Sequence, residues 1–421
     1  MELLHSATFP SKQRLLIVVT IAITLFTCIP HVYSFAEDPN FLLKQQEPPS
    51  QTSTIPKLQN GDVTTHENCD IFSGEWVPNP EGPYYSNTTC YAIPEYQNCM
   101  KYGRPDTDFM KWKWRPDGCE DAVPVFDPLR FLELMRGKTM AIVGDSVSNN
   151  HVNSLICLLS QVEYPVDTSV VPGYNFKRWT YKTYNFTIAT FWSTFLVKSR
   201  PNPTLPRLTD LFDVYHDEVD ERWTTAIGEF DYVIMSSGHW HFRASIYYKN
   251  RTIVGCHFCQ LPNITDLTLL YGYRRAFRTA FDAFLTLENF KGVLYLRTFA
   301  PSHYEGALWN EGGDCLRKQP HQRNATQDEM TVKLHKIQLE EFWRAEKEAK
   351  KKGMRLRLLD TTQAMWLRPD GHSGRYGHLP EASGRSDCVH WCLPGPIDIL
   401  NDFLLAMIER EQDKGSLAQV L

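Results

Sequence analysis

The strongest constraint on the fold is a change of pattern that begins near Gly137 and then repeats. A short apolar run reaches Gly144-Asp145-Ser146, and a helix-like segment follows it to residue 159. Similar apolar runs recur at 230–236, 292–299 and 354–359, and helix-like segments occupy about 271–287, 327–352 and 396–411. Strands that alternate with helices are typical of a parallel sheet with helices on both faces. The sequence therefore predicts a three-layer α/β/α fold whose active site lies at the carboxyl ends of the strands.

The N-terminus predicts a membrane anchor. Lys12 and Arg14 precede an apolar run at 15–33, and Glu37 and Asp38 follow it. The run is short for a plasma-membrane span but suits a thinner internal membrane. The positive-inside rule then makes 1–14 a cytosolic tail, 15–33 a signal-anchor transmembrane helix, and the rest of the chain luminal. The alternative is a cleaved signal peptide ending near Ser34, which also leaves the bulk of the chain in the lumen.

Three segments follow the apolar run. Residues 34–66 are rich in Pro, Gln, Ser and Thr without apolar periodicity, which predicts a flexible stem. Residues 67–120 carry Cys, Pro, Trp and Tyr but no long apolar run, which indicates a small disulfide-stapled lobe. Residues 121–421 hold the alternating pattern and form the predicted catalytic α/β domain.

The cysteines and sequons support a secretory compartment. Of the 11 Cys, Cys28 lies in the apolar run, and the others form an even set: Cys69, Cys90, Cys99, Cys119, Cys157, Cys256, Cys259, Cys315, Cys388 and Cys392. Such a set suggests disulfides, whose connectivity does not follow from spacing. The Cys-x-x-Cys at 256–259 also allows zinc, but a second ligand pair at zinc spacing is missing, so we predict no metal site. Sequons predict N-glycosylation at Asn87, Asn185, Asn250, Asn263 and Asn324.

Charge and aromatic content narrow the choice of partner. A net charge of −5 over 421 residues gives no basic surface for nucleic acid, which we exclude as a partner. The same balance disfavours a polyanionic substrate and leaves neutral sugars open. Aromatic residues make up 13 % of the chain, including 11 Trp, and such rings can pack against sugars. Most of them belong to the expected core, while Trp and Tyr of the small lobe are expected to form an acceptor cleft.

Two motifs carry candidate catalytic side chains. Ser146 follows the first strand, where its hydroxyl would open at the top of the sheet and its N–H near a helix N-terminus. Asp387-Cys-Val-His390 precedes the last helix, and its three-residue step can bring both side chains to one side of a turn or loop. His390 would deprotonate Ser146, and Asp387 would orient the imidazole. The alternatives are a helix cap at Asp145 and Ser146, and a capping Asp387 beside a surface histidine.

A third motif, Ser236-Ser-Gly238-His239-Trp, follows the run at 230–236. Gly238 permits close backbone approach, so its N–H is a candidate oxyanion donor, and His239 is a candidate substrate contact. Gly144, Asp145 and Asn150 are candidates for the same oxyanion or substrate environment. The alternative is a turn with a packed His and Trp.

Longer strings resemble a known family. The order Ser, then Asp-x-x-His near the C-terminus, is that of GDSL or SGNH esterases, and the first motif is not the Gly-x-Ser-x-Gly elbow of α/β-hydrolases. From Cys69 to the last helix, the chain resembles the plant trichome birefringence-like family of the PC-esterase group. The strings are Cys69-Asp-Ile-Phe-Ser-Gly-Glu-Trp76, Gln97-Asn-Cys-Met-Lys-Tyr-Gly-Arg-Pro-Asp106, Trp112-Lys-Trp-Arg-Pro-Asp-Gly-Cys119, Gly144-Asp-Ser146, Leu358-Leu-Asp-Thr-Thr-Gln363 and Asp387-Cys-Val-His-Trp-Cys-Leu-Pro-Gly395.

The resemblance implies an SGNH-like fold and a type II Golgi membrane protein that acetylates hemicelluloses or pectin, with Ser146, Asp387 and His390 as catalytic residues. The chain looks most like the branch that acts on xyloglucan side chains, and a neighbouring branch acetylates mannans. No cofactor is expected to stay bound. An acetyl donor is required, either acetyl-CoA or an acetylated intermediate, and a donor-supplying Golgi membrane protein is an expected partner beside the polysaccharide acceptor.

The resemblance also implies a disulfide pattern. The implied pairs are Cys69–Cys119, Cys90–Cys157, Cys99–Cys392 and Cys315–Cys388, which leaves Cys256 and Cys259 to each other. One position departs from the family pattern Gly-Asp-Ser-x-x-Arg-Asn, because Asn149 replaces the Arg and removes a fixed charge near the nucleophile. The loss of the Arg predicts either weaker activity or another hydrogen-bond donor that takes its place. An acetyl-esterase and a non-catalytic polysaccharide-binding protein are the alternatives from other functional classes.

Overall fold

The computed structural model describes residues 69–170, 176–203, 211–288, 290–309, 311–377 and 385–420. The predicted tail, anchor and stem lie outside the described residues. Within those ranges, none of the helices combines the length and the apolar character that crossing a membrane requires.

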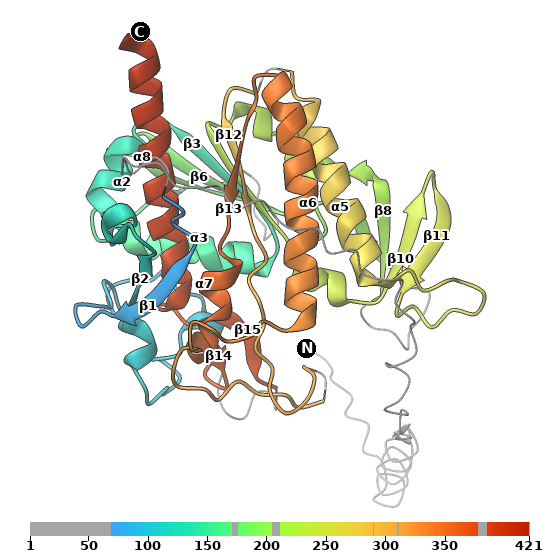
Figure 1. Cartoon of the computed structure of the whole chain (residues 1–421), viewed down its shortest axis with the longest axis horizontal. Helices are drawn as coiled ribbons and strands as arrows, with labels where there is room; N and C mark the ends of the chain where they lie inside the picture. The colour runs from blue at the N-terminus through green and yellow to red at the C-terminus, as the bar shows by residue number, and fades with distance from the viewer. Residues whose placement is uncertain are drawn as a thin grey trace, which may run out of the picture. The chain divides into compact units, whose positions relative to one another are not determined.

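A seven-stranded sheet forms the centre of the fold, in the order β13-β12-β9-β3-β6-β5-β4 (Figure 1). Its strands are β3 (Thr139–Gly144), β4 (Val166–Asp167), β5 (Phe176–Tyr181), β6 (Phe186–Trp192), β9 (Tyr232–Ser236), β12 (Val293–Arg297) and β13 (Arg355–Leu359). The strands from β13 to β6 are parallel, while β5 and β4 add antiparallel pairs at one edge. The predicted parallel sheet is confirmed, and β3 lies at its centre.

Helices cover both faces of this sheet. They are α2 (Pro128–Leu134), α3 (Ser146–Leu159), α4 (Glu221–Thr224), α5 (Thr268–Leu285), α6 (Glu329–Lys351), α7 (Thr362–Trp366) and α8 (Ile399–Val420). Helices α2, α3 and α8 pack on one face, and α5 and α6 lie side by side over the other (Figure 1). Along β3, Met140 and Ile142 enter the first core and Ala141 and Val143 the second. This alternation produces the predicted three layers.

A second, four-stranded sheet was not predicted from the sequence. It has the order β11-β10-β8-β7, with β7 (Val197–Pro201), β8 (Phe212–Val219), β10 (Ser245–Lys249) and β11 (Thr252–His257). Charged residues interrupt its apolar pattern: Asp213 in β8 is buried and accepts a hydrogen bond from Arg200 Nε of β7 at 2.9 Å. The strand tolerates this buried carboxylate because the carboxylate is paired. The charged residue nevertheless interrupts the apolar pattern, so hydrophobicity alone does not reveal the strand.

Residues 69–120 contain the paired strands β1 (Gly74–Pro78) and β2 (Trp112–Pro116). Rings of this segment pack onto α8, since the Phe72 and Trp114 centroids lie 5.1 and 6.0 Å from that of Phe403. The segment therefore shares the hydrophobic core beneath α8.

Five disulfides join the ten cysteines that follow the apolar run. They are Cys69–Cys119, Cys90–Cys157, Cys99–Cys392, Cys256–Cys259 and Cys315–Cys388, the same pairs that the family resemblance implies. Because Cys256 and Cys259 are bonded to each other, their sulfurs are not thiolate ligands, and the zinc alternative for this pair is removed.

The five sequon asparagines lie at turns. Asn185, Asn250, Asn263 and Asn324 are exposed, and Asn87 is partly exposed. Each is therefore accessible for modification, and glycosylation at these positions stays a prediction.

Asp398, the residue before α8, makes the stability of the fold depend on pH. It accepts hydrogen bonds from the Tyr85 hydroxyl (2.7 Å) and the Ser154 hydroxyl (2.5 Å), yet burial raises its pKa to about 6. An unfolded Asp titrates near 4, so the folded state holds this proton more tightly, and the unfolding free energy falls as pH rises from about 4 through 6. In Asp398→Asn we expect this fall to shrink by up to ~3 kcal/mol, measured by denaturant titration at pH 4 and pH 7.

The control is Asp282→Asn, because the Asp282 side chain is 56 % exposed on α5. A pH dependence of Asp398→Asn equal to that of the wild type would contradict the assignment.

Candidate functional site

Ser146 lies at the carboxyl end of the central strand β3, as the first residue of α3. The preceding Asp145 caps this helix, since its Oδ1 accepts the Val147 N–H at 3.1 Å. Its Oδ2 accepts the Gly238 N–H at 2.9 Å and so joins the ends of β3 and β9. The cap expected in this turn is therefore Asp145, and the Ser146 hydroxyl is not used for it.

Gly144 is required by close packing. A Cβ at this position would lie 1.9 Å from the Ser236 carbonyl oxygen and 2.3 Å from Ser148 Oγ. Glycine alone lets β3, β9 and α3 approach so closely. The residue therefore sets the place of Ser146 through the backbone and carries no side chain for substrate.

Asp387 and His390 lie on β15 (Asp387–Trp391), which pairs with β14 (His372–Gly374), and not in the predicted turn or loop. Asp387 Oδ2 accepts a hydrogen bond from His390 Nδ1 at 2.8 Å. Its Oδ1 accepts the backbone N–H groups of Val389 and His390, each at 3.0 Å. With the Nδ1 proton held in this way, the neutral imidazole presents Nε2 as its base.

The two groups of this pair hold well-separated pKa values. Burial opposes ionisation of Asp387, but the charge of His390 and the hydrogen bonds to the carboxylate lower the pKa of Asp387 to about 2. Burial likewise opposes the imidazolium, but the charge and hydrogen bond of Asp387, together with Asp145, raise the pKa of His390 above 6.5. Asp387 therefore stays ionised and stabilises the imidazolium that forms when His390 takes a proton.

One cavity of about 820 Å³ is lined by both Ser146 and His390. The His390 side chain is only 16 % exposed, so the alternative of a surface histidine is wrong. Its Nε2 is buried and has no hydrogen-bond partner among the described residues. A buried nitrogen without a partner is costly in a purely structural site. The other walls include Trp240, Phe299, Tyr304, Trp309, His321 and Trp366.

Asn150, a candidate oxyanion donor in the sequence, instead clamps the strand that carries the histidine. Its Nδ2 donates to the Trp391 carbonyl oxygen at 3.2 Å, and its Oδ1 accepts the Trp391 N–H at 2.9 Å. Both ends of the amide are thus engaged by the residue that follows His390. Asn150 therefore fixes β15 against α3, and the oxyanion interpretation does not fit this geometry.

The structure opposes the predicted role of Gly238 and is compatible with that of His239. The Gly238 N–H is engaged by Asp145 Oδ2, so it is not available as an oxyanion donor in this arrangement. A Cβ on Gly238 would lie 2.5 Å from the Phe299 ring, which explains the glycine. His239 lines the cavity, as a substrate contact would, and its Nε2 lies 2.8 Å from the Ala300 carbonyl oxygen. Burial lowers the pKa of His239, so this ring is neutral and donates from Nε2.

Sequence reasoning missed Arg297, which ends β12 in a fully buried position. Its guanidinium donates to the Ser236 hydroxyl at 2.7 Å and to the Val147 carbonyl oxygen at 3.3 Å. Burial lowers the pKa of Arg297 to about 10, so the group remains a cation at neutral pH. A positive charge thus stands beside the first turn of α3 although position 149 is Asn. A charged residue at the carboxyl end of a buried strand was the signal that could have revealed it.

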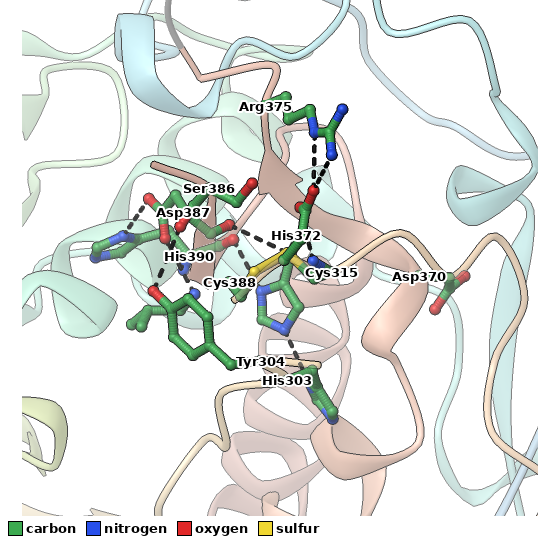
Figure 2. The surroundings of a disulfide bond; sticks show 12 residues. His303, Tyr304, Cys315, Asp370, His372, Arg375, Ser386, Asp387, Cys388 and His390 are labelled. Atoms are coloured by element: carbon green, nitrogen blue, oxygen red, sulfur yellow. Dashed lines mark hydrogen bonds and ion pairs between the residues drawn. A yellow bond between two sulfur atoms is a disulfide. The ribbon is translucent and has the colours of Figure 1, made fainter. Parts of the chain in front are cut away.

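A histidine pair also lies behind His390 (Figure 2). His372 Nδ1 lies 3.0 Å from the His390 carbonyl oxygen, His372 Nε2 lies 2.7 Å from His303 Nδ1, and His303 Nε2 lies 2.9 Å from the Trp366 carbonyl oxygen. Two neutral rings carry two N–H protons for these three contacts. Burial lowers the pKa of both rings, to about 3 for His372, which opposes a third proton. When both rings are neutral, one of these three contacts therefore has no proton between its two atoms.

The aromatic residues that line the cavity do not come from the small lobe, although Tyr96 of that lobe packs edge-on against the His390 ring, with the two centroids 5.6 Å apart. The indole N–H groups of Trp76 and Trp114 donate to backbone carbonyls, at 2.9 Å each. The rings that line the cavity follow β9 and β12 or lie farther along the chain. They belong to the α/β domain itself.

Comparison with known proteins identifies the family of this chain. Residues 123–407 match PC-Esterase, described as a GDSL/SGNH-like acyl-esterase family found in Pmr5 and Cas1p, and residues 67–120 match the PMR5 N terminal domain. The chain is 74 % identical over 423 residues to protein trichome birefringence-like 19 of Arabidopsis thaliana, across 100 % of this chain and 99 % of that protein.

Two further relatives carry an activity in their names. Xyloglucan O-acetyltransferase 4 of Populus trichocarpa is 42 % identical over 346 residues, covering 82 % of each chain. Xyloglucan O-acetyltransferase 3 of the same species is 39 % identical over 346 residues, covering 82 % of this chain and 86 % of that protein. The chain therefore belongs to the PC-esterase family of GDSL/SGNH-like acyl-esterases and, within it, to the trichome birefringence-like proteins.

Proposed function

We propose that this protein is a polysaccharide O-acetyltransferase that acetylates hydroxyl groups of xyloglucan side chains through an acetyl-serine at Ser146. The observation that carries the proposal is the buried, unpartnered Nε2 of His390, on a ring that lines one cavity with Ser146. Asp387 Oδ2 accepts a hydrogen bond from the other ring nitrogen at 2.8 Å, which supports a role as the acidic member of a Ser-His-Asp triad.

The first half of the reaction forms the acetyl-enzyme. His390 Nε2 takes the Ser146 hydroxyl proton as Oγ attacks the acetyl carbonyl of the donor. The tetrahedral intermediate then collapses, the bond to the leaving group breaks, and the leaving group takes the proton from the imidazolium. Asp387 stabilises that imidazolium throughout.

The second half moves the acetyl group to the sugar. An acceptor hydroxyl gives its proton to His390 Nε2 and attacks the acetyl-serine carbonyl. Collapse releases the acetylated sugar, and Ser146 Oγ regains the proton. Transfer prevails over hydrolysis only if the acceptor is held at high effective concentration against water at ~55 M, and the aromatic walls of the cavity suit a sugar.

The oxyanion is assigned to the N-terminus of α3. Ser146 is the first residue of that helix, where backbone N–H groups lack acceptors within the helix and the helix dipole is positive. The Ser146 N–H is therefore the proposed donor. Gly238, whose N–H is held by Asp145, is not part of this assignment.

The acceptor and the compartment rest on relatives and on the sequence. Two relatives of about 40 % identity are named xyloglucan O-acetyltransferases, which favours xyloglucan over the mannan alternative. The apolar run at 15–33, the sequons and the disulfides support a type II Golgi protein with a luminal catalytic domain. The proposed donor is acetyl-CoA or an acetylated intermediate, delivered by a Golgi membrane protein.

The test incubates the purified luminal protein with an acetyl donor and a panel of xyloglucan, glucomannan and xylan oligosaccharides, followed by mass spectrometry. We expect a mass gain of one acetyl group on xyloglucan oligosaccharides and no gain on the others. A gain confined to glucomannan would replace the proposed acceptor, and no gain on any acceptor would reject the transferase.

An acetyl-esterase is the second candidate, because the matched family is described as acyl-esterases and the same three residues can pass the acetyl group to water. Acetylated oligosaccharides without a donor separate the two functions. Release of acetate faster than transfer between oligosaccharides would establish the esterase, and the absence of both reactions would leave a binding protein.

A further inference from the structure

Two large apolar side chains are exposed at one wall of the cavity, on the segment that follows β12. Leu308 is 62 % exposed and Trp309 is 50 % exposed, and both line the cavity that contains Ser146 and His390. Apolar side chains that are exposed together at the rim of a cavity are candidates for a binding surface. We call the segment from Tyr304 to Cys315 the platform loop, of which all residues but 310 are described.

The platform loop is held in place by its own contacts. Glu305 and Asp314 pair through backbone hydrogen bonds of 2.8 and 3.2 Å at the base of the loop. The Leu308 carbonyl oxygen accepts the N–H groups of Glu311 and Gly313, each at 3.0 Å. A Cβ on Gly313 would lie 2.1 Å from the Ala307 carbonyl oxygen, so the turn closes tightly. Trp309 therefore sits on a closed turn whose ends are fixed.

The same loop is covalently joined to the strand that carries the proposed base. Cys315 forms a disulfide with Cys388, which lies between Asp387 and His390 on β15 (Figure 2). The His303 N–H also donates to the Cys388 carbonyl oxygen at 3.1 Å, one residue before the loop begins. The indole of Trp309 and the imidazole of His390 thus belong to one cross-linked unit, and such preorganisation lowers the cost of binding.

The other tryptophans of the cavity are covered by protein. Trp366 is 9 % exposed and stacks on His321 at 5.4 Å. Trp240 packs against Trp192 and Phe212, and the Arg243 guanidinium lies 4.2 Å from its ring centroid. Among the ring and cation contacts of the described residues, Trp309 has only one, in which the Arg385 guanidinium lies 5.8 Å from its ring centroid. Half of the surface of Trp309 is exposed.

We propose that Trp309, supported by Leu308, is the platform on which a sugar ring of the acceptor polysaccharide stacks, so that a neighbouring hydroxyl reaches His390 and the acetyl-serine. This inference rests on the proposed transfer to a saccharide and names the surface that holds that saccharide. An indole face matches the C–H face of a pyranose, and neither carries a charge that depends on pH. The platform acts on the acceptor step, so its loss is expected to weaken transfer to the sugar more than acetylation of Ser146.

The test measures binding apart from catalysis. In a Ser146→Ala background, calorimetry with a xyloglucan oligosaccharide should show a Kd about tenfold weaker for Trp309→Ala and close to unchanged for Trp309→Tyr. The matched control is Trp343→Ala, because Trp343 is similarly exposed, at 56 %, but lies on α6 and is not part of the cavity lining. We expect the control to stay within about twofold of the parent protein.

With Ser146 intact, Trp309→Ala should raise the KM for the acceptor by a larger factor than any loss in the rate of acetyl-enzyme formation. Binding by Trp309→Ala as tight as by Trp343→Ala, no detectable binding by the parent protein, or an equal loss in acetylation of Ser146 would each overturn the platform. Trp309-dependent binding in a protein that transfers no acetyl group would reject the proposed function and leave the platform standing.

Discussion

Ser146→Ala is expected to reduce acetyl transfer to a xyloglucan oligosaccharide by at least about 10³-fold, because the variant lacks the oxygen that would carry the acetyl group. The fold should survive, since the cap of α3 is the Asp145 carboxylate and no described contact depends on the Ser146 hydroxyl. Intact-protein mass spectrometry after incubation with donor alone should show one added acetyl group on the wild type and none on the variant.

The matched control is Ser160→Ala at the other end of α3, where the Ser160 hydroxyl donates to the Cys157 carbonyl oxygen at 2.7 Å. This variant should acetylate and transfer like the wild type. Transfer by Ser146→Ala at the wild-type rate would remove Ser146 from the mechanism, even if the protein remains an acetyltransferase.

Asp387→Asn gives the second large effect and a distinct pH signature. The Asn side chain cannot stabilise the imidazolium, and its amide can bind the wrong tautomer of His390, so kcat should fall on the order of 10³–10⁴-fold. In the wild type, His390 must be neutral to act as base, so kcat rises with pH through a pKa that Asp387 and Asp145 hold above 6.5. Loss of the carboxylate lowers that pKa, and the rising limb of the kcat profile should move to lower pH.

Measurement of kcat from pH 4 to pH 9 in both proteins checks this sign. The control is Asp282→Asn, an exposed carboxylate on α5 paired with Arg344, which should leave the profile in place. A variant with reduced kcat but an unshifted rising limb would mean that Asp387 positions His390 without setting its pKa.

Strands β3, β9, β12 and β13 were predictable because they read as apolar runs, as parallel strands covered on both faces do, whereas β4, β5 and β6 of the same sheet were not predicted. The runs at 230–236, 292–299 and 354–359 became β9, β12 and β13 within a few residues. The second sheet was not predictable by the same rule. Strand β8 carries Asp213, whose burial is compensated by Arg200 from a different strand, and such a pairing has no signature along the chain.

The site divides in the same way. Ser146, Asp387 and His390 were predictable because local motifs carry them, and the structure adds the contact of Asp387 with His390 and the shared cavity. The partners of polar groups were not predictable. Asn150 binds the backbone of Trp391, which lies 241 positions away along the sequence. The Gly238 N–H donates to Asp145, which lies 93 positions away. Such contacts depend on which strands and helices become neighbours and on which acceptor each N–H group finds there. A local sequence motif contains neither kind of information.

The cysteines that flank the proposed base have a consequence for where this chain can be active. Cys388 in β15 is bonded to Cys315, and Cys392 just after β15 is bonded to Cys99, so two covalent links from distant parts of the chain hold the segment that carries the imidazole. Such links persist in oxidising compartments and are reduced in the cytosol. Under the proposed mechanism, a copy of the chain kept under reducing conditions would retain Ser146 but lose the two covalent links that hold His390 in place.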